Sequence, residues 1–192
     1  MGKILMGPQT WLYPMPTLLV GAKVDGKANF MAVAWGGIAN GAPPMLSVAI
    51  RHNRYTLKGI RQNLTFSVNI PSGDMVREAD YCGLKSGARV DKVEVCRFRV
   101  FYGQLESAPL IEQCPVNLEC KVMHILNLGT HALVIGRIEE THALESCLTN
   151  GKPDVTKIRP FIYTPTPSSH YRALGEVIAQ AFSVGKELKT EK

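Results

Sequence analysis

The feature of this sequence that most limits its fold is a pair of apolar runs separated by a tight-turn signal. Residues 18–24 (LLVGAKV) and 28–35 (ANFMAVAW) flank the tripeptide Asp25-Gly26-Lys27. An Asp-Gly pair supplies the positive φ angles that a two-residue hairpin needs. We therefore expect two antiparallel strands here, joined by a short turn.

Similar short runs recur along the chain, and turn-forming segments such as GGIANGAPP lie between them as expected loops. The further strands predicted from these runs are 45–50, 65–70, 97–102, 116–125, 130–138 and 158–163. Residues 131–136 (HALVIG) are apolar at nearly consecutive positions, so we expect that strand to be covered on both faces, with a dimer partner outside. Many short strands separated by turns are typical of a closed antiparallel barrel.

Helical patterns interrupt the strands at three places. RYTLKGIRQN, residues 54–63, has Asn53 in position to cap its N-terminus. A second helix is expected to begin at Ser72 or Asp74 and to end at Gly83, before the polar loop LKSGARVDK. After an extended linker, TPTPSS, the chain from residue 175 is expected to form an amphipathic helix with Val177, Ile178, Ala181 and Phe182 on one side. The predicted class is thus mainly β, with short helices and a C-terminal helix.

The length and composition of the chain are consistent with one domain spanning residues 1–192. The chain has 192 residues, 45% of them hydrophobic, which suffices for one sizeable core. No apolar run approaches the roughly 20 residues of a membrane helix, and no signal peptide is recognisable, so we expect a cytoplasmic protein without membrane contact. The five cysteines are scattered and contain no C-x-x-C pair, so reduced, mostly buried thiols and no metal site are expected.

A formal charge of +6 favours an anionic partner, which could be nucleic acid, a phosphorylated cofactor or an acidic protein. The basic residues are spread along the chain and form no dense tract with interleaved aromatics, so nucleic acid is not the expected partner. Residues 21–27 match the spacing of a phosphate loop, but Ala28 stands where Ser or Thr must hold magnesium. No dinucleotide fingerprint and no hydrolase nucleophile elbow is present either.

The strongest local signal is SVAIRHNRYT, residues 47–56, where a strand leads into the start of a helix. The first N–H groups of a helix are unpaired, and Arg51 and Arg54 can fork onto phosphate oxygens while Thr56 donates its hydroxyl. On this pattern alone, an alternative remains, in which the arginines are solvated charges and Asn53 only caps the helix.

Three further segments extend this signal. NFMAVAWGG (29–37), SVAIRHNRYT (47–56), FSVNIPS (66–72) and YRALGEVIAQAF (171–182) occur in the order and spacing of one family. Through them the chain, over residues 10–185, resembles the flavin reductase-like FMN-binding family, which includes the flavoredoxins. The resemblance implies a split β-barrel of the Greek-key type with helical caps that works as a homodimer and passes electrons through non-covalently bound FMN.

The resemblance also implies where the cofactor lies. The segment 31–35 would flank the isoalloxazine, 47–56 would take the ribityl chain and phosphate, 69–70 would lie near the ring, and the loop containing Ser86, Gly87 and Lys92 would close over the cofactor. The cofactor-binding residues expected on this basis are Met31, Ala32, Val33, Ala34, Trp35, Ser47, Arg51, His52, Asn53, Arg54, Thr56, Asn69, Ile70, Ser86, Gly87 and Lys92. Two alternatives stay open: Trp35 as a core residue, and Tyr171 as either a contact at the edge of the site or a packing residue.

Two functions compete within the family, an electron carrier between redox partners and a flavin reductase that takes hydride from NADH or NADPH. The likeness to the flavoredoxins favours the carrier. No catalytic residue is expected, because a flavin carries the redox chemistry itself. The alternative from another class is a non-catalytic β-barrel that binds nucleic acid.

Overall fold

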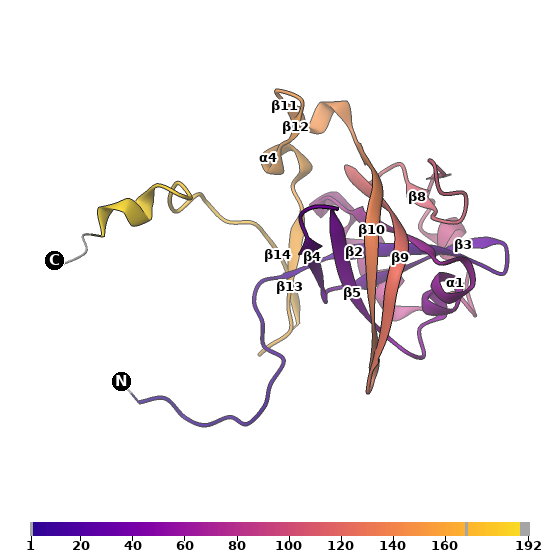
Figure 1. Ribbon diagram of the computed structural model, residues 1–192, viewed down its shortest axis with the longest axis horizontal. Coiled ribbons are helices and arrows are strands. Elements are labelled where there is room, and N and C mark those ends of the chain that lie inside the picture. Colours follow the sequence, from indigo (N-terminus) through magenta and orange to yellow (C-terminus); the bar gives the residue numbers. More distant parts are fainter. Residues whose placement is uncertain (1, 168, 189–192) are drawn as a thin grey trace.

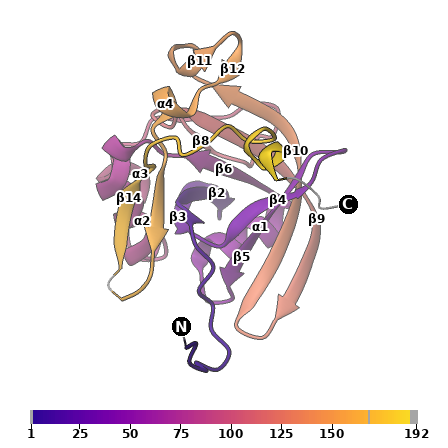
Figure 2. The same ribbon diagram turned by 90° about the vertical axis from the view of Figure 1, so that its left-hand side faces the viewer.

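The computed structural model describes residues 2–167 and 169–188, and its centre is a seven-stranded antiparallel sheet with the order β3-β2-β6-β9-β10-β5-β4 (Figure 1). Its strands are β2 (Leu18–Val24), β3 (Lys27–Val33), β4 (Gly36–Asn40), β5 (Met45–Arg51), β6 (Thr65–Ile70), β9 (Val116–Leu128) and β10 (His131–Ala143). The sheet curves on itself, as Figure 2 shows, so that β3 also contacts β5. The mainly β, antiparallel class predicted from the sequence is confirmed.

The hairpin at the start of the sheet forms as predicted. Asp25 and Gly26 adopt φ angles of 49° and 82°, and Val24 pairs with Lys27. β3 ends at Val33, two residues earlier than expected. The backbone then bends into β4, where the carbonyl of Trp35 accepts a hydrogen bond from the Ala49 N–H at 2.8 Å.

Alternation along the strands builds two cores, one on each face of the sheet. Val20 and Val48 belong to the core inside the barrel, with Phe66 from β6. Leu19 and Phe30 point to the other face and pack with Cys82 in a second core. Because successive side chains of a strand face opposite ways, the β2–β3 hairpin serves both cores.

Three helices cover this second face and the barrel end. The helix α1 (Tyr55–Asn63) packs on β2, while α2 (Val76–Leu84) and α3 (Lys92–Val95) pack on β3. α1 and α2 confirm the predicted helices, α2 being preceded by the 3₁₀ helix η1 (Gly73–Met75), whereas α3 was not predicted. The N-cap of α1 is Arg54 and not Asn53, and no side chain caps it.

The remaining elements are short. They are β1 (Met15–Pro16), β7 (Val100–Phe101), β8 (Leu110–Ile111), η2 (Glu145–Cys147), β11 (Leu148–Thr149), β12 (Lys152–Pro153), α4 (Val155–Ile158), β13 (Phe161–Thr164), β14 (His170–Ala173) and η3 (Val184–Glu187). β1, β13 and β14 form a separate three-stranded sheet beside the barrel.

Several expectations are wrong in detail. The segment expected as a loop, 36–44, contains β4, because its backbone pairs with β5. Of the strand expected at 97–102, only β7 forms, and residue 158 ends α4 before β13 begins. The segment TPTPSS is the connection between the antiparallel strands β13 and β14 and not an extended linker; its residue 168 lies outside the described part of the chain.

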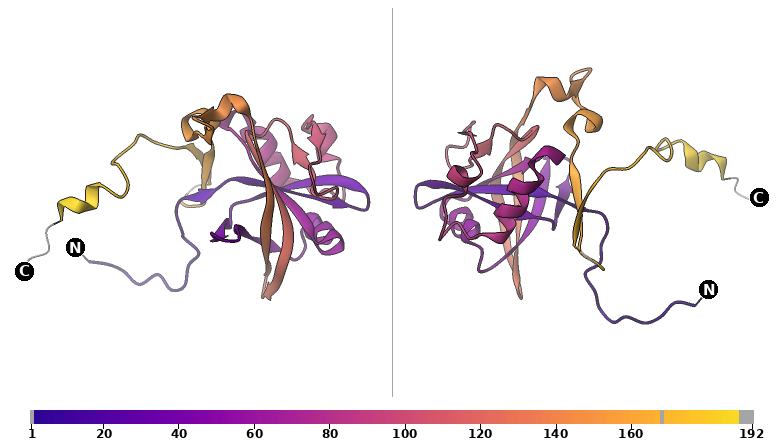
Figure 3. Two further views of the ribbon diagram at one scale, coloured as in Figure 1. Left: turned by 45° about the horizontal axis from the view of Figure 1, so that its top comes forward. Right: turned by 180° about the vertical axis from the view of Figure 1, so that it is seen from behind.

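The predicted C-terminal amphipathic helix is also wrong. Residues 174–183 form no helix, and only η3 follows before residue 188; the last four residues of the predicted helix lie outside the described part of the chain. Val177, Ile178 and Phe182 are 90%, 99% and 98% exposed. A short amphipathic helix is marginal in water unless its apolar side is packed, and this segment extends away from the barrel (Figure 3).

The strand β10 is longer than predicted, and its burial alternates. Ala132 and Val134 are fully buried, whereas Leu133 and Ile135 on the outer face are only half-buried. The expected cover on both faces is therefore incomplete within one chain.

No helix of the described residues is long and apolar enough to cross a bilayer.

Candidate functional site

A polar cavity of about 290 Å³ lies where β5 leads into α1. The loop between α2 and α3 forms its opposite wall. Its lining residues are Met31, Arg51, Asn53, Arg54, Tyr55, Thr56, Lys85, Ser86, Gly87 and Lys92. The cavity therefore combines the end of one strand, the start of one helix and a loop about thirty residues further along the chain.

Positive charge dominates this cavity. Arg51, Arg54, Lys85 and Lys92 line it, and none of its described lining residues is acidic. Within residues 2–167 and 169–188, none of these four side chains forms an ion pair. Cations gathered without a counter-charge repel one another, so the arrangement favours an anionic ligand that accepts several hydrogen bonds.

Lys92 is the most deeply buried of these cations. Its side chain donates from Nζ to the carbonyl oxygens of Phe30 at 2.8 Å and Cys82 at 3.0 Å. The residue is 4% exposed, and this burial lowers the pKa of Lys92 below its ordinary value. An ammonium has three N–H donors, so one remains for a ligand in the cavity.

The start of α1 supplies further donors. The Oγ1 of Thr56 accepts a hydrogen bond from Asn29 Nδ2 at 2.7 Å, which leaves the hydroxyl proton of Thr56 free to donate. The first N–H groups of the helix, those of Tyr55 and Thr56, have no partner one turn earlier in the helix. Arg54 donates from Nη1 to the carbonyl of Gly83 at 3.1 Å, which ties α1 to α2.

The loop between α2 and α3 approaches the barrel closely at Gly87. A Cβ atom added there would lie 1.8 Å from Oδ1 of Asn29, the residue that holds Thr56. Only glycine fits this approach without moving either the loop or the Asn29 side chain. The loop therefore lies close against the floor of the cavity.

A second cavity, of about 420 Å³, adjoins the first, and Arg54 lines both. The end of β3 forms one wall, and α2 with the β13–β14 hairpin forms the other. Its lining residues are Thr17, Ala32, Val33, Ala34, Arg54, Asp80, Gly83, Leu84, Tyr163, Ser169 and Tyr171. One wall is thus apolar and the other carries hydroxyl groups.

Thr17 is notable in this second cavity because its Oγ1 is buried and has no hydrogen-bond partner among the described residues. The nearby Tyr171 hydroxyl does have one, since it donates to Asp80 Oδ1 at 2.9 Å. Burial, together with that carboxylate, raises the pKa of Tyr171. A buried polar atom without a partner is costly, so Thr17 favours a ligand with a hydrogen-bonding edge.

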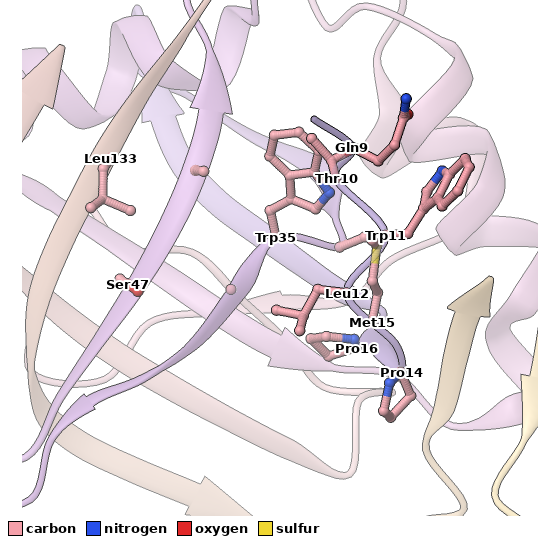
Figure 4. Close-up of a pocket in the computed structure, with 13 residues that line it drawn as sticks. Gln9, Thr10, Trp11, Leu12, Pro14, Met15, Pro16, Trp35, Ser47 and Leu133 are labelled. Atoms are coloured by element: carbon pink, nitrogen blue, oxygen red, sulfur yellow. The ribbon is translucent and has the colours of Figure 1, made fainter. Parts of the chain in front are cut away.

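A third, more apolar cavity of about 670 Å³ lies outside β4 and β5 (Figure 4). Trp35, which is 41% exposed, and Leu133 line it together with Trp11 and Leu12 of the N-terminal segment. The Trp35 ring stacks on His131 with their centroids 4.8 Å apart. Met31 lines the first cavity, and Ala34 lines both the second and the third. The segment 31–35 therefore runs along all three cavities.

The structure brings most of the residues proposed from the sequence to these cavities. The first cavity contains Met31, Arg51, Asn53, Arg54, Thr56, Ser86, Gly87 and Lys92. The second contains Ala32, Val33 and Ala34, and the third contains Ala34, Trp35 and Ser47. His52 is exposed and lies in a shallow depression at the outer side of α1.

Asn69 and Ile70 line none of the described cavities. The Asn69 amide donates to the Leu19 carbonyl and to Ser67 Oγ, and its Oδ1 accepts from Ile111 N and Asn117 Nδ2. These bonds use both donors and both lone pairs of its side chain. Ile70 packs against a small core at the other end of β6. The structure thus places Asn69 in the protein interior and Ile70, which is partly buried, at the edge of a small core.

Sequence reasoning missed part of the lining. Tyr55 lies inside the RHNRYT motif and Lys85 begins the polar loop, so position in these segments was the available signal. Thr17, Asp80 and Tyr163 carry no local signal. Pairing of β1 with β13 brings Thr17 and Tyr163 together, although they are far apart in sequence.

Comparison with known proteins identifies similar chains. The family described as "Flavin reductase like domain" matches residues 10–164. A crystal structure of flavoredoxin from Methanosarcina acetivorans is 42% identical with a TM-score of 0.92, covering 97% of this chain and 98% of that one. Flavoredoxin of Desulfovibrio vulgaris (Miyazaki F) is 38% identical with a TM-score of 0.88, covering 96% of this chain and 100% of that one. An FMN-binding protein from Thermus thermophilus, 22% identical with a TM-score of 0.78 over 94% of this chain and 99% of that one, shares the fold.

Proposed function

Since the chain belongs to the flavin reductase-like family, we propose that it is a flavoredoxin-like electron carrier that holds FMN non-covalently. The observation that carries this proposal is the cavity at the start of α1, where four cations lack a counter-charge. A phosphate monoester is a small dianion with several acceptor oxygens, which suits such a cluster.

FMN is the cofactor, and its phosphate belongs in the first cavity. Arg51 and Arg54 would fork onto its oxygens, Lys92 would donate its third N–H, and Thr56 would donate its hydroxyl. Asn53 lies between the two arginines and would face the ribityl chain. Ser86 and Gly87 would cover the phosphate from the loop side.

The isoalloxazine ring would lie along residues 31–35, in the second cavity. The ring has apolar faces and a polar edge, and the cavity has the same division. Ala32 and Ala34 would contact one face of the ring. The buried Thr17 hydroxyl would form a hydrogen bond with the polar edge of the ring. Trp35 would stand at the ring's outer end, beside the third cavity.

Bound FMN supplies the redox chemistry, exchanging electrons singly or as a hydride. The side chains of this protein bind, orient and shield the cofactor. No acid–base group is required of them. Lys92 is held at the phosphate end by two carbonyls, so its charge acts on affinity for the phosphate.

The proposal includes a homodimer. Within one chain the outer face of β10 is half-buried, and the apolar C-terminal segment contacts nothing that would bury it. A second copy would cover both surfaces. We further propose one domain over residues 1–192, a cytoplasmic location, and a redox protein as electron donor or acceptor.

An anaerobic mixing experiment separates the carrier from an NAD(P)H-dependent flavin reductase. The FMN-loaded protein is mixed in turn with NADH, NADPH and a reduced ferredoxin, and the visible flavin band is followed by stopped flow. A carrier should be bleached rapidly by the reduced ferredoxin and only slowly by either nicotinamide. Rapid bleaching by NADH or NADPH would instead establish the reductase. Colourless protein that takes up no FMN but binds oligonucleotides in a salt-sensitive way would overturn both.

A further inference from the structure

A carboxylate distinguishes the second cavity from the first. Asp80 of α2 is the one acidic residue among the described residues that line the second cavity. The described lining of the first cavity contains four cations and no acidic residue. A ligand that extends through both cavities is therefore expected to carry an anionic group at one end and a hydrogen-bond donor at the other.

Tyr171 holds the carboxylate of Asp80 in place. Its hydroxyl donates to Asp80 Oδ1 at 2.9 Å. The Tyr171 ring packs edge-on against Phe161, with the ring centroids 5.4 Å apart, and its backbone pairs with Tyr163 in the β13–β14 hairpin. Burial, together with the neighbouring carboxylate, raises the pKa of Tyr171, so its hydroxyl stays protonated and remains the donor. One oxygen of Asp80 is thus occupied from within the protein.

The other carboxylate oxygen is available to a ligand. Asp80 Oδ2 has no hydrogen-bond partner in the described part of the chain, and Asp80 forms no ion pair there. Arg54 lines the same cavity but donates to the Gly83 carbonyl. Thr17, which is 6% exposed, has a buried Oγ1 without a partner among these residues. The cavity thus contains an unused acceptor and an unused hydroxyl donor.

These two groups complement the pyrimidine edge of a flavin ring. That edge carries the N3–H between the carbonyls C2=O and C4=O, so it presents one donor flanked by two acceptors. The N3–H is also the only N–H group of the oxidised ring. A carboxylate oxygen accepts such a proton, and the Thr17 hydroxyl can donate to a neighbouring carbonyl. Hydrogen bonds to a charged acceptor are stronger than those between neutral groups.

We propose that Asp80 accepts a hydrogen bond from the N3–H of the FMN ring and that Tyr171 is the residue that positions its carboxylate. This inference rests on the proposed binding of FMN, with the ring in the second cavity. Reduction places negative charge on the pyrimidine side of the ring, and a carboxylate at that edge opposes it. Asp80 therefore lowers the reduction potential of the bound cofactor.

Binding of FMN and of 3-methyl-FMN by the parent protein tests the hydrogen bond. The analogue has a methyl group in place of the N3 proton, and its phosphate is unchanged. The parent should bind 3-methyl-FMN roughly tenfold or more weakly than FMN, because one charge-assisted contact is lost. Equal affinities would overturn this inference and leave the proposed function standing. A parent protein that binds neither ligand would overturn the proposed function and this inference with it.

Replacing the carboxylate tests whether Asp80 is the acceptor. In Asp80→Ala, the preference for FMN over 3-methyl-FMN should disappear, because the acceptor is gone and the smaller side chain leaves room for the methyl group. Asp74→Ala is the matched control, since Asp74 is exposed in η1 and lines neither cavity. It should keep the preference of the parent. An undiminished preference in Asp80→Ala would overturn the assignment.

Redox titration against dyes of known potential separates the charge of Asp80 from a purely structural role. Asp80→Asn keeps the shape of the side chain and removes its charge, so the midpoint potential of bound FMN should become more positive. Asp74→Asn should leave the potential unchanged. A potential in Asp80→Asn equal to that of the parent, or more negative, would overturn the inferred effect of the charge.

Tyr171→Phe tests the positioning role. This change removes the hydroxyl that donates to Asp80 and keeps the ring that packs on Phe161. The carboxylate is still present but no longer held, so the preference for FMN over 3-methyl-FMN should decrease without disappearing. The same preference in Tyr171→Phe as in the parent would exclude Tyr171 as the positioning residue.

Discussion

At the scale of single residues, the protein concentrates positive charge without neutralising it. Some cations on the surface form ion pairs, such as Lys58 with Asp25 at 2.6 Å and Arg99 with Glu112 at 2.7 Å. Exposed pairs of that kind contribute little to stability. Arg51 and Arg54, by contrast, face a cavity and have no ion-pair partner in the described part of the chain. We attribute the grouping of these cations in one cavity, without an acidic residue in its lining, to ligand binding.

Replacing Arg51 or Arg54 with alanine should therefore weaken FMN binding. Each change removes one charge-assisted contact, about 1.5–3 kcal/mol, which corresponds to roughly ten- to hundredfold in affinity. Quenching of flavin fluorescence measures the affinity. Arg99→Ala removes an equal charge far from the cavity and should leave the affinity unchanged. Unaltered titrations in both cavity variants would refute this placement of the phosphate.

Lys92 should make the affinity for FMN change with pH in the alkaline range. Burial lowers the pKa of Lys92 below 10.5, so its charge is present below the lowered pKa and is lost as pH rises through it. FMN affinity should therefore fall with rising pH before an ordinary lysine would titrate. Equilibrium titrations across this range measure the effect. Lys92→Met should bind FMN more weakly and lose this pH dependence, and a Met variant with the parent's profile would exclude Lys92 as its cause.

At the scale of elements, the loop between α2 and α3 approaches Asn29 closely at Gly87. In Gly87→Ala, the new methyl group would lie 1.8 Å from Asn29 Oδ1, so either the loop or the Asn29 side chain that holds Thr56 must move. We expect weaker FMN binding with a modest decrease in thermal stability. Gly41→Ala is the matched control, because a Cβ atom there meets nothing within 4 Å. Equal FMN affinity in both variants would show that the loop does not cover the cofactor.

Elements with local signals were predictable from the sequence. The Asp25-Gly26 turn, the strand 65–70 and the helix of RYTLKGIRQN depend on residues adjacent in sequence, and each forms as expected. β4 depends instead on pairing with β5, which its GGIAN sequence does not reveal. The C-terminal pattern was helical, but an apolar stripe forms a stable helix only where something packs on it.

The two cavities also differ in how much of their lining could be predicted from the sequence. The phosphate cavity is built largely from SVAIRHNRYT and one loop, so most of its lining was visible as contiguous motifs. The second cavity brings Thr17 and Tyr171 together through pairing of β1, β13 and β14, and Asp80 joins them from α2 by accepting the Tyr171 hydrogen bond. No spacing in the sequence could have joined these three residues. Asn69 shows the opposite case, a residue within a family motif that hydrogen-bonds only inside the core.

At the scale of the whole molecule, both terminal segments project on the same side of the barrel (Figures 1 and 3). Trp11, Leu12, Val177 and Ile178 on these segments are exposed large apolar residues. Exposed apolar surface is typical of interaction sites. The proposed homodimer would bury it.

Sedimentation equilibrium should therefore find a dimer. In Val177→Asp/Ile178→Asp, a charge on the C-terminal segment should shift the equilibrium toward monomer, because burying an unpaired carboxylate is costly. Val155→Asp, at an exposed position of α4, is the matched control and should remain dimeric. A monomeric parent protein, or a double variant as dimeric as the control, would contradict the proposed interface.

The central claim is that the cation cavity binds the phosphate of FMN, and calorimetric titration with FMN and with riboflavin tests it most directly. Riboflavin has the same ring and lacks only the phosphate. The parent protein should bind FMN about a hundredfold or more tightly than riboflavin, since at least two charge-assisted contacts depend on the phosphate. In Arg51→Ala/Arg54→Ala, most of that preference should disappear while riboflavin affinity stays the same. Equal affinities of the parent for both ligands, or an undiminished preference for FMN in the double variant, would contradict the account.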